Sequence, residues 1–178
     1  MHIGQAEPAH LRRITEMAAS WQLSSADGEA GTRQGFLFGD WRFDDYARFF
    51  GEAEHFIVAT EETELVGFLI AYSSARSELD PWLHERIRPH CPEYVFLEQI
   101  CVAPGWTQRG VGTGLLSRML LGTVRLPVIS EISEEPFNGA SSALHRKLGF
   151  APVFRLTRPA GIRTAVWLRA PSEGESRS

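Results

Sequence analysis

Apolar residues recur along the chain with two different periods, and these periods predict the order of its helices and strands. Leu11, Ile14 and Met17 lie three residues apart and Trp21 follows after four, a spacing typical of one helix face. Runs rich in β-branched and aromatic residues instead predict strands. The predicted strands are 2–5, 56–60, 65–73, 94–103, 128–132, 150–157 and 162–169. The predicted helices are 11–21, a segment after Asp40, a short one that Asp80 and Pro81 open and Pro89 ends, 111–123 and 139–148.

This order of elements predicts a layered α/β (α+β) fold. An antiparallel hairpin is followed by a strand–loop–helix–strand–helix run and then by a closing hairpin. We therefore expect a mixed, mostly antiparallel sheet of six to seven strands flanked by helices, and not a doubly wound parallel sheet. In a chain of 178 residues, one domain is expected over 1–170, with a loop at 24–35 and a frayed Ser/Glu-rich tail at 171–178.

The composition is that of a soluble domain, with 43% hydrophobic and 22% charged residues. No apolar run approaches the ~18 residues that a membrane span requires. The net charge of −4 and the lack of a Lys/Arg block disfavour nucleic acid and anionic membranes as partners. The two cysteines form no CxxC pair, which favours a reducing, cytoplasmic location. His84, His90 and Cys91 lack a fourth ligand, so no metal site is predicted.

The most informative segment is the glycine-rich stretch 110–114, between a predicted strand and a predicted helix. Glycines let the backbone approach a ligand closely, and the first amides of a helix have no internal partner, so this segment suits a phosphate or pyrophosphate. A P-loop needs a Gly-Lys-Ser/Thr that is missing here, and the glycine spacing departs from the dinucleotide fingerprint. A turn that simply lets the strand and the helix pack is the structural alternative.

Two motifs at matching spacing resemble the GNAT family of acyl-CoA-dependent N-acyltransferases. The first is Glu98-Gln99-Ile100-Cys101-Val102-Ala103-Pro104 with the glycine loop after it. The second is Asn138 followed by a helix that closes with Lys147-Leu148-Gly149-Phe150. The resemblance covers about residues 94–156, and the flanking elements match in order only. The chain departs from the family pattern at Thr107, where Gln or Arg usually opens the loop, and at His145, where many relatives carry a tyrosine.

The resemblance implies an acetyl-CoA-dependent N-acetyltransferase that binds donor and amine together and requires no metal. It implies that Glu98 is the general base and that His145, in place of the family tyrosine, is the acid that protonates the departing thiolate. The residues implied to hold the coenzyme are Ile100, Cys101, Val102, Gln108, Arg109, Gly110, Val111, Gly112, Thr113 and Asn138. The family fold also implies a central parallel pair, 94–103 with 128–132, that splays apart to admit the coenzyme.

Each of these residues also has an ordinary structural interpretation. Glu98 could pair with an arginine, His145 could be a half-buried core residue, and Asn138 could cap the helix that follows it. Three further acidic residues are either simply solvated or attract a cationic amine, namely Glu131, Glu134 and Glu135.

Two other functional classes stay open beside the enzyme. One is a non-catalytic acyl-CoA-binding sensor or interaction module on the same fold, and the other is a dinucleotide oxidoreductase. For the enzyme, the acceptor is expected to be a small-molecule or peptide amine that contacts Trp41, Tyr46 and the segment 77–92. Relatives are often dimers, so the resemblance also admits a homodimer.

Overall fold

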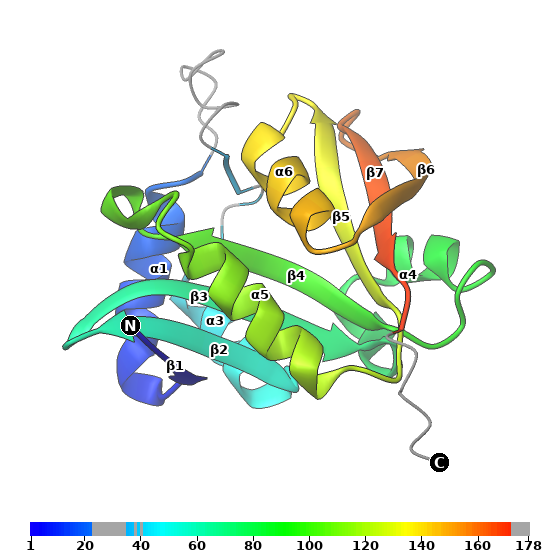
Figure 1. Ribbon diagram of the computed structural model, residues 1–178. Coiled ribbons are helices and arrows are strands. Elements are labelled where there is room, and N and C mark those ends of the chain that lie inside the picture. The colour runs from blue at the N-terminus through cyan, green and yellow to red at the C-terminus, as the bar shows by residue number, and fades with distance from the viewer. Residues whose placement is uncertain (23–34, 38, 40, 172–178) are drawn as a thin grey trace.

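The computed structural model describes residues 1–22, 35–37, 39 and 41–171. Its centre is a seven-stranded sheet with the order β1-β2-β3-β4-β5-β7-β6 (Figure 1). The strands are β1 His2–Gln5, β2 His55–Glu61, β3 Glu64–Ser73, β4 Val95–Val102, β5 Val128–Glu135, β6 Ala151–Thr157 and β7 Arg163–Arg169. The α-helices are α1 Leu11–Ala19, α3 Phe43–Glu52, α4 Pro81–Ile87, α5 Val111–Gly122 and α6 Gly139–Lys147.

Neighbouring strands run antiparallel throughout this sheet except for β4 and β5, which are parallel. The predicted mixed, mostly antiparallel sheet flanked by helices is therefore confirmed. The two predicted hairpins are confirmed as β2–β3 and β6–β7. The predicted loop at 24–35 and the tail at 171–178 lie outside the described residues, apart from Gly35 and Pro171.

The central parallel pair splays apart, as the family fold implied. Its ladder holds three residue pairs, from Val95↔Val128 to Leu97↔Ser130, although each strand is eight residues long. Beyond Leu97 the two strands diverge (Figure 1), while β4 stays paired with β3 as far as Val102. The divergence leaves the β5-facing edge of β4 without a strand partner.

The sheet separates two hydrophobic cores. On one face α1, α3 and α4 bury apolar residues such as Ile14, Phe49 and Ile87. On the other face α5 buries Leu115 and its neighbours, and α6 packs beside it through Leu144. Figure 1 shows α5 crossing the front of the sheet and α1 and α3 behind it. Residues of β4 belong to both cores, so the strand is packed from both faces of the sheet.

Three local features differ from the sequence prediction. Trp21 lies just past the end of α1, and its indole Nε1 donates to the Val102 carbonyl at 2.7 Å. An unpredicted 3₁₀ segment, Ser74–Leu79, leads into α4, whose first turn is capped by Asp80. Strand β5 continues past residue 132 to Glu135. Within the described part of the chain, none of the helices is long and apolar enough to cross a membrane.

Candidate active site

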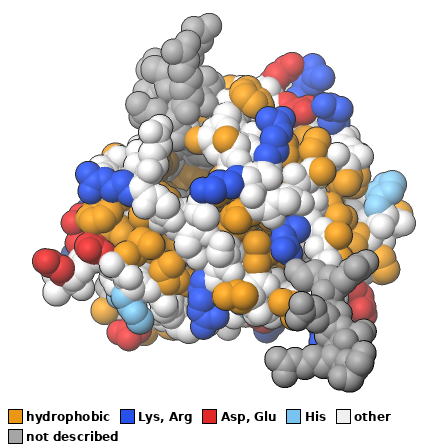
Figure 2. All heavy atoms as spheres, viewed as in Figure 1, with side chains coloured by type: hydrophobic (Ala, Val, Ile, Leu, Met, Phe, Trp, Pro, Cys, Tyr) orange, Lys and Arg blue, Asp and Glu red, His pale blue; other side chains and the backbone are white. Residues whose placement is uncertain are grey.

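A cavity of about 1110 Å³ lies between the diverging ends of β4 and β5. Its wall is formed by these strands, the first turn of α5, the inner face of α6 and the turn between β6 and β7. Figure 2 shows a hollow on this face of the molecule with hydrophobic side chains inside it. Every residue that the sequence predicted for catalysis or coenzyme binding lines the cavity, except Arg109.

The start of α5 forms the part of the cavity that suits a phosphate. Gly110 and Gln108 have left-handed backbones, with φ of 85° and 60°, and such residues turn N–H groups toward one concave side. No side chain caps the helix, so the N–H groups of its first turn have no acceptor within it. Lys147 of α6 adds a cation here, because its Nζ donates to Thr113 Oγ1 at 3.4 Å. An ammonium group beside a positive helix end stabilises a bound anion.

Gly112 and Arg109 differ in what they contribute to this end of the cavity. A Cβ on Gly112 would lie 3.3 Å from Leu144 Cδ2 and 3.6 Å from Val102 Cγ2, so a side chain at this position would press against Leu144, and glycine avoids this tight contact between α5 and α6. The guanidinium carbon of Arg109 lies 5.1 Å from the centre of the Trp106 ring; Trp106 lines the cavity, whereas Arg109 is not among the lining residues. A direct contact between Arg109 and a pyrophosphate therefore stays a prediction.

The free edge of β4 presents backbone groups to the cavity. The Ala103 N–H donates to the Val66 carbonyl of β3 at 2.9 Å. Because successive peptide groups of a strand point to opposite sides, those of Ile100 and Val102 face the open edge, and that of Cys101 faces β3. The Val102 carbonyl accepts the Trp21 indole hydrogen, which leaves the N–H groups of Ile100 and Val102 for a ligand. The edge can thus continue the sheet by hydrogen bonding to an extended amide-containing ligand.

Glu98 lies half-buried on β4 at the cavity wall, where the Tyr72 hydroxyl donates to its Oε2 at 2.7 Å. Among the described residues it forms no ion pair, so the arginine-paired alternative is not what the structure shows. Burial raises the pKa of Glu98 to about 7, and the Tyr72 hydrogen bond opposes that rise. The charges of Asp80 and Glu131 raise this pKa further, whereas Arg158 lowers it. A carboxyl with this pKa can take up and release a proton near neutral pH.

His145 is fully buried, at 1% exposure, rather than half-buried as the structural alternative supposed. Its Nδ1 lies 2.8 Å from the Ser141 carbonyl, and because a carbonyl only accepts, Nδ1 carries the hydrogen. Its Nε2 has no hydrogen-bond partner, and burial lowers the pKa of His145 to about 4. The ring is therefore neutral at pH 7 with a lone pair on Nε2, so the general-acid role stays a prediction that first requires protonation of Nε2.

Asn138 caps α6, as its structural alternative proposed. Its Oδ1 accepts from the Ser141 N–H at 3.2 Å, and its Nδ2 donates to the Phe36 carbonyl at 3.0 Å. These two contacts tie the segment around Phe36 to the start of α6. The side chain also lines the cavity, and a contact with the coenzyme stays a prediction.

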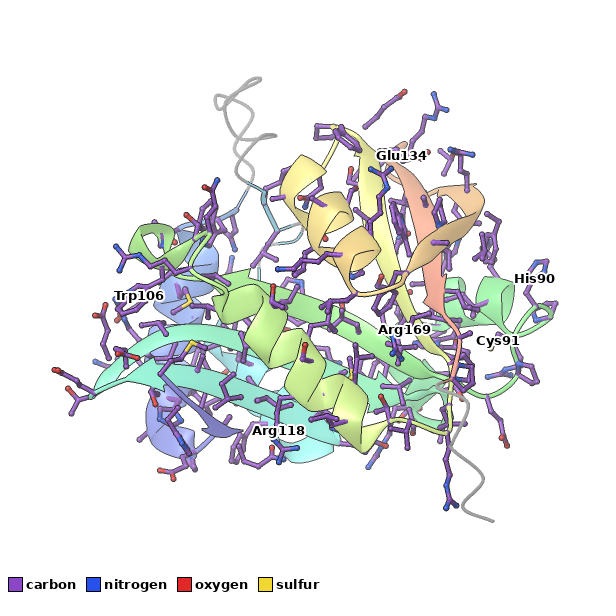
Figure 3. The ribbon with its side chains drawn as sticks, in the orientation of Figure 1. His90, Cys91, Trp106, Arg118, Glu134 and Arg169 are labelled. Carbon is purple, nitrogen blue, oxygen red and sulfur yellow. The ribbon has the colours of Figure 1, made fainter. Side chains whose placement is uncertain are left out.

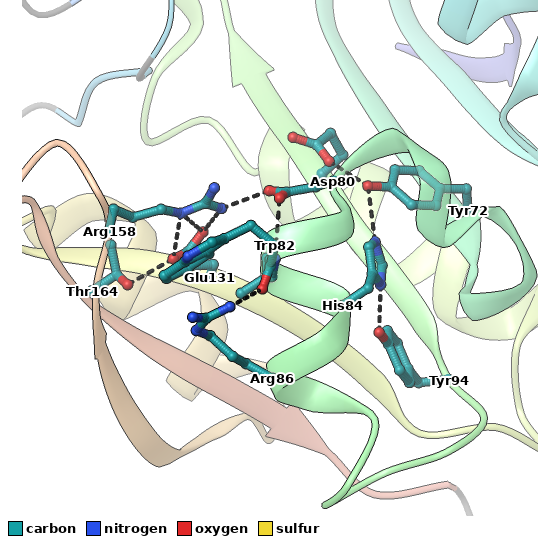
Figure 4. Close-up of polar contacts among 11 residues, drawn as sticks. Tyr72, Asp80, Trp82, His84, Arg86, Tyr94, Glu131, Arg158 and Thr164 are labelled. Atoms are coloured by element: carbon teal, nitrogen blue, oxygen red, sulfur yellow. Dashed lines mark hydrogen bonds and ion pairs between the residues drawn. The ribbon is translucent and has the colours of Figure 1, made fainter.

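Arg158, in the turn between β6 and β7, contacts two carboxylates, one from β5 and one from the start of α4, at the side of the cavity (Figure 4). Its Nε donates to both carboxylate oxygens of Glu131 at 3.0 and 3.1 Å, and its Nη2 pairs with Asp80 at 2.8 Å. Thr164 donates to the same Glu131 carboxylate at 2.6 Å. Two carboxylates around one guanidinium leave this cluster with a net charge of −1, which favours a cationic group nearby.

The other two glutamates of β5 are also ion-paired rather than simply solvated. Glu134 pairs with Arg155 and Glu135 with Arg163, at 2.8 Å in each case. The arginines are 66% and 54% exposed, so both pairs are surface contacts. Neither glutamate lines the cavity.

Only some of the residues predicted to shape the acceptor site line the cavity. Trp41 lines the cavity, as do Leu79 and Asp80 from the segment 77–92. Tyr46 is fully buried, and its hydroxyl donates to Gln99 Oε1 at 3.1 Å, so it supports the wall from behind.

The three residues considered as metal ligands, His84, His90 and Cys91, have different surroundings. His84 is buried between two tyrosines, and the His90 ring lies 4.8 Å from that of Phe154. Figure 3 places His90 and Cys91 at the opposite end of the molecule from Trp106, which precedes the glycine loop. In the ranges described, no group of three or more potential metal-ligating side chains occurs.

Three residues of the site were missed by the sequence analysis. Tyr72 lies in a strand of almost uniformly buried residues, so its pattern indicated core and gave no sign of the Glu98 contact. Lys147 belongs to the motif that closes α6, but nothing in the sequence brought it to Thr113. Arg158 lies in the closing turn, and only the paired strands bring it to Glu131.

Several solved structures share the fold of this chain. The Ard1 protein of Thermoplasma volcanium is 16% identical, with a TM-score of 0.71 over 97% of this chain and 98% of that one. An N-acetyltransferase from Staphylococcus aureus Mu50 is 19% identical, with a TM-score of 0.66 over 94% and 100%. Naa20 of Chaetomium thermophilum, solved with a bisubstrate analogue, is 12% identical, with a TM-score of 0.67 over 96% and 87%. At these identities the likeness concerns the fold.

No curated protein sequence matches the chain. The family model described as Acetyltransferase (GNAT) family matches residues 17–150, which include β4, the glycine loop and α6. Members of this family transfer acyl groups from acetyl-CoA, and the splayed parallel pair with an open β4 edge is the matching feature of the fold. By a sequence match over more than half its length and by its fold, the chain belongs to the GNAT family of acetyltransferases.

Proposed function

We propose that the protein is an N-acetyltransferase that moves the acetyl group of acetyl-CoA directly to a primary amine while both substrates are bound. The observation that carries the proposal is the state of Glu98. Its carboxyl has no ion-pair partner among the described residues and a pKa of about 7. It lies on the cavity wall, two residues before Ile100, whose N–H faces the open edge of β4. A purely structural protein gains nothing from such a group, because burying it is unfavourable.

The residues along the cavity fit acetyl-CoA. The unpartnered N–H groups at the start of α5, with the Lys147 ammonium beside them, suit the pyrophosphate. The free N–H groups of Ile100 and Val102 suit the amide groups of the pantetheine arm and the thioester carbonyl. Acetyl-CoA supplies a thioester whose carbonyl carbon is open to attack and whose thiolate is a stable leaving group.

Glu98 prepares the acceptor. An alkyl ammonium with a pKa near 10.4 must lose a proton before its nitrogen can attack. Glu98 accepts that proton, directly or through one water, and the amine forms the new N–C bond as the C–S bond breaks. As the amide forms, its nitrogen loses the second proton, and the departing thiolate takes up a proton, so coenzyme A leaves as the free thiol. Because His145 is neutral with an unprotonated Nε2, the proposed route does not depend on a proton from it.

The state of His145 also favours a second candidate, a non-catalytic sensor of acyl-CoA. A neutral ring buried where relatives carry a proton donor is what a binding module would tolerate. In that case acetyl-CoA would bind tightly and no amine would be acylated.

The test is release of free thiol from acetyl-CoA across a panel of small amines and peptides, with Glu98→Gln as the matched variant. The enzyme predicts amine-dependent release by the wild type and a fall of about 10²-fold or more in the variant. The variant should still bind coenzyme A, because Glu98 does not belong to the phosphate end of the cavity. Tight binding of acetyl-CoA with no release on any amine would favour the sensor. The proposal includes a cytoplasmic location, where the buried free thiols of Cys91 and Cys101 stay reduced.

A further inference from the structure

Three buried side chains that the proposed reaction does not use, Tyr72, His84 and Tyr94, lie in a row (Figure 4), and Tyr72 at one end of this hydrogen-bond chain contacts Glu98. Tyr72 of β3 donates to Glu98 Oε2 at 2.7 Å, and His84 Nε2 of α4 lies 3.4 Å from the Tyr72 hydroxyl. On its other side His84 Nδ1 contacts the Tyr94 hydroxyl just before β4. Tyr72, His84 and Tyr94 are at most 1% exposed, so water does not compete for these contacts.

The chemistry of these groups fixes the position of each hydrogen. An ionised Glu98 only accepts, so the single hydroxyl hydrogen of Tyr72 is committed to Oε2. The contact between Tyr72 and His84 then requires a hydrogen on Nε2. A neutral imidazole has only one ring hydrogen, so Nδ1 is the acceptor and Tyr94 is its donor. One tautomer of His84 therefore satisfies the whole chain.

The groups of the chain keep these hydrogens across the neutral range. Burial lowers the pKa of His84 and raises the pKa of Tyr94 to about 12, while burial and the Glu98 charge raise the pKa of Tyr72. The chain is thus a fixed row of neutral dipoles, and its hydrogens all point toward Glu98. The charged and titratable groups that act on these residues and on Glu98 are Asp80, Glu78, Arg88, Cys91, Arg158 and Glu131.

The hydrogen-bond chain of Tyr72, His84 and Tyr94 gives the two carboxylate oxygens of Glu98 different surroundings. Tyr72 occupies Oε2, whereas no described residue hydrogen-bonds to Oε1. Ring packing restrains Tyr72, whose centroid lies 5.7 Å from that of Phe96 and 6.0 Å from that of Phe49. Resting on the function proposed above, we propose that Tyr72 is a positioning residue for Glu98, held in its donating orientation by His84 and Tyr94, which leaves Oε1 to take the acceptor's proton.

The first test follows the Glu98 carboxyl by ¹³C NMR in protein with labelled glutamate, with Glu98→Gln to assign its signal. In the wild type Glu98 should titrate near pH 7. In Tyr72→Phe the midpoint should rise by about one to two pH units, because a charged group loses one hydrogen bond. Tyr46→Phe is the matched control: it removes a buried hydroxyl that donates to Gln99, the neighbour of Glu98, and should leave the midpoint in place. An unchanged midpoint in a folded Tyr72→Phe overturns the proposal.

Two further measurements separate positioning from a merely structural role. His84→Phe should raise the titration midpoint of Glu98 by less than Tyr72→Phe does. The midpoint in His84→Gln, whose amide can still donate to Tyr72, should lie below that in His84→Phe. If Tyr72→Phe does not fold, ¹⁵N shifts of the imidazoles in the wild-type protein decide. At about pH 9, where Glu98 is ionised, the proposal requires His84 to be protonated on Nε2 alone, and the Nδ1 tautomer or an imidazolium overturns it.

These readouts need no turnover. If the acetyltransferase function were wrong, Glu98 and His84 would still give the predicted NMR results. If only the positioning role were wrong, amine acetylation would still depend on Glu98, and Tyr72→Phe would leave the pH dependence of the rate unchanged.

Discussion

Arg158→Met tests whether the charged cluster holds α4 against the far half of the sheet. The variant leaves the carboxylates of Glu131 and Asp80 together without their cation, and their side chains are 11% and 22% exposed. Removing one partner of a fully buried ion pair lowers the free energy of unfolding by ~3–5 kcal/mol. Removing one partner of an exposed ion pair lowers it by ~0–1 kcal/mol. Arg158 is 27% exposed, so the cluster lies nearer the buried limit. We expect a loss of about 2–3 kcal/mol, which for a chain of this size lowers Tm by ~5–10 °C.

Urea and thermal unfolding measure this loss, and Arg155→Met is the control. Arg155 forms the same kind of pair with Glu134 but is 66% exposed, so its removal should cost no more than ~0.5 kcal/mol. The Arg158 variant should also move the pH at which activity falls on the acid side upward, because Arg158 lowers the pKa of Glu98. If both variants lose the same stability, the cluster does not bind α4 to β5 and the reasoning fails.

Two predictions concern the coenzyme end of the cavity. Gly112→Val should weaken the binding of coenzyme A, measured by calorimetry, about ten-fold or more. The added side chain would place its Cβ 3.3 Å from Leu144 and push α5 away from α6. Unchanged affinity would contradict this close approach of the two helices. Lys147→Met should raise the Kd of coenzyme A about three- to ten-fold at low salt and less at high salt, because it removes a cation beside Thr113. Arg109→Met, measured by the same method, tests the predicted contact between Arg109 and the pyrophosphate, and an effect on the Kd as large as that of Lys147→Met would support that contact.

The sheet was predictable from local pattern because its strands alternate with clear turns and breakers. The two hairpins and the glycine loop follow from short segments whose spacing is visible in the sequence. The splayed pair was expected only from the resemblance to the family. The ends of elements were less predictable. Glu131 was expected near the end of a strand, yet β5 runs on to Glu135 because β7 pairs with it that far.

The protonation chemistry of the site was not predictable, because it depends on contacts between distant segments. Tyr72 and Glu98 are 26 residues apart, and their hydrogen bond exists only when β3 and β4 pair. His145 carries the same side chain whether it is exposed or buried, and only its 1% exposure and the Ser141 contact make it neutral. The motifs shared with the family indicated most of the residues that line the cavity, and packing decided which of them can hold a proton.

The most direct test of the account is the pH dependence of amine acetylation, measured as kcat/KM for the acceptor in the wild type and in Glu98→Gln. A base must be ionised to act, so the wild-type rate should fall as the pH drops through about 7, the pKa of Glu98. The variant should lose that acid limb, and its rate should be at least ~10²-fold lower and rise only as the amine itself deprotonates. A variant that keeps the wild-type rate and the same acid limb would contradict the role of Glu98 as the base.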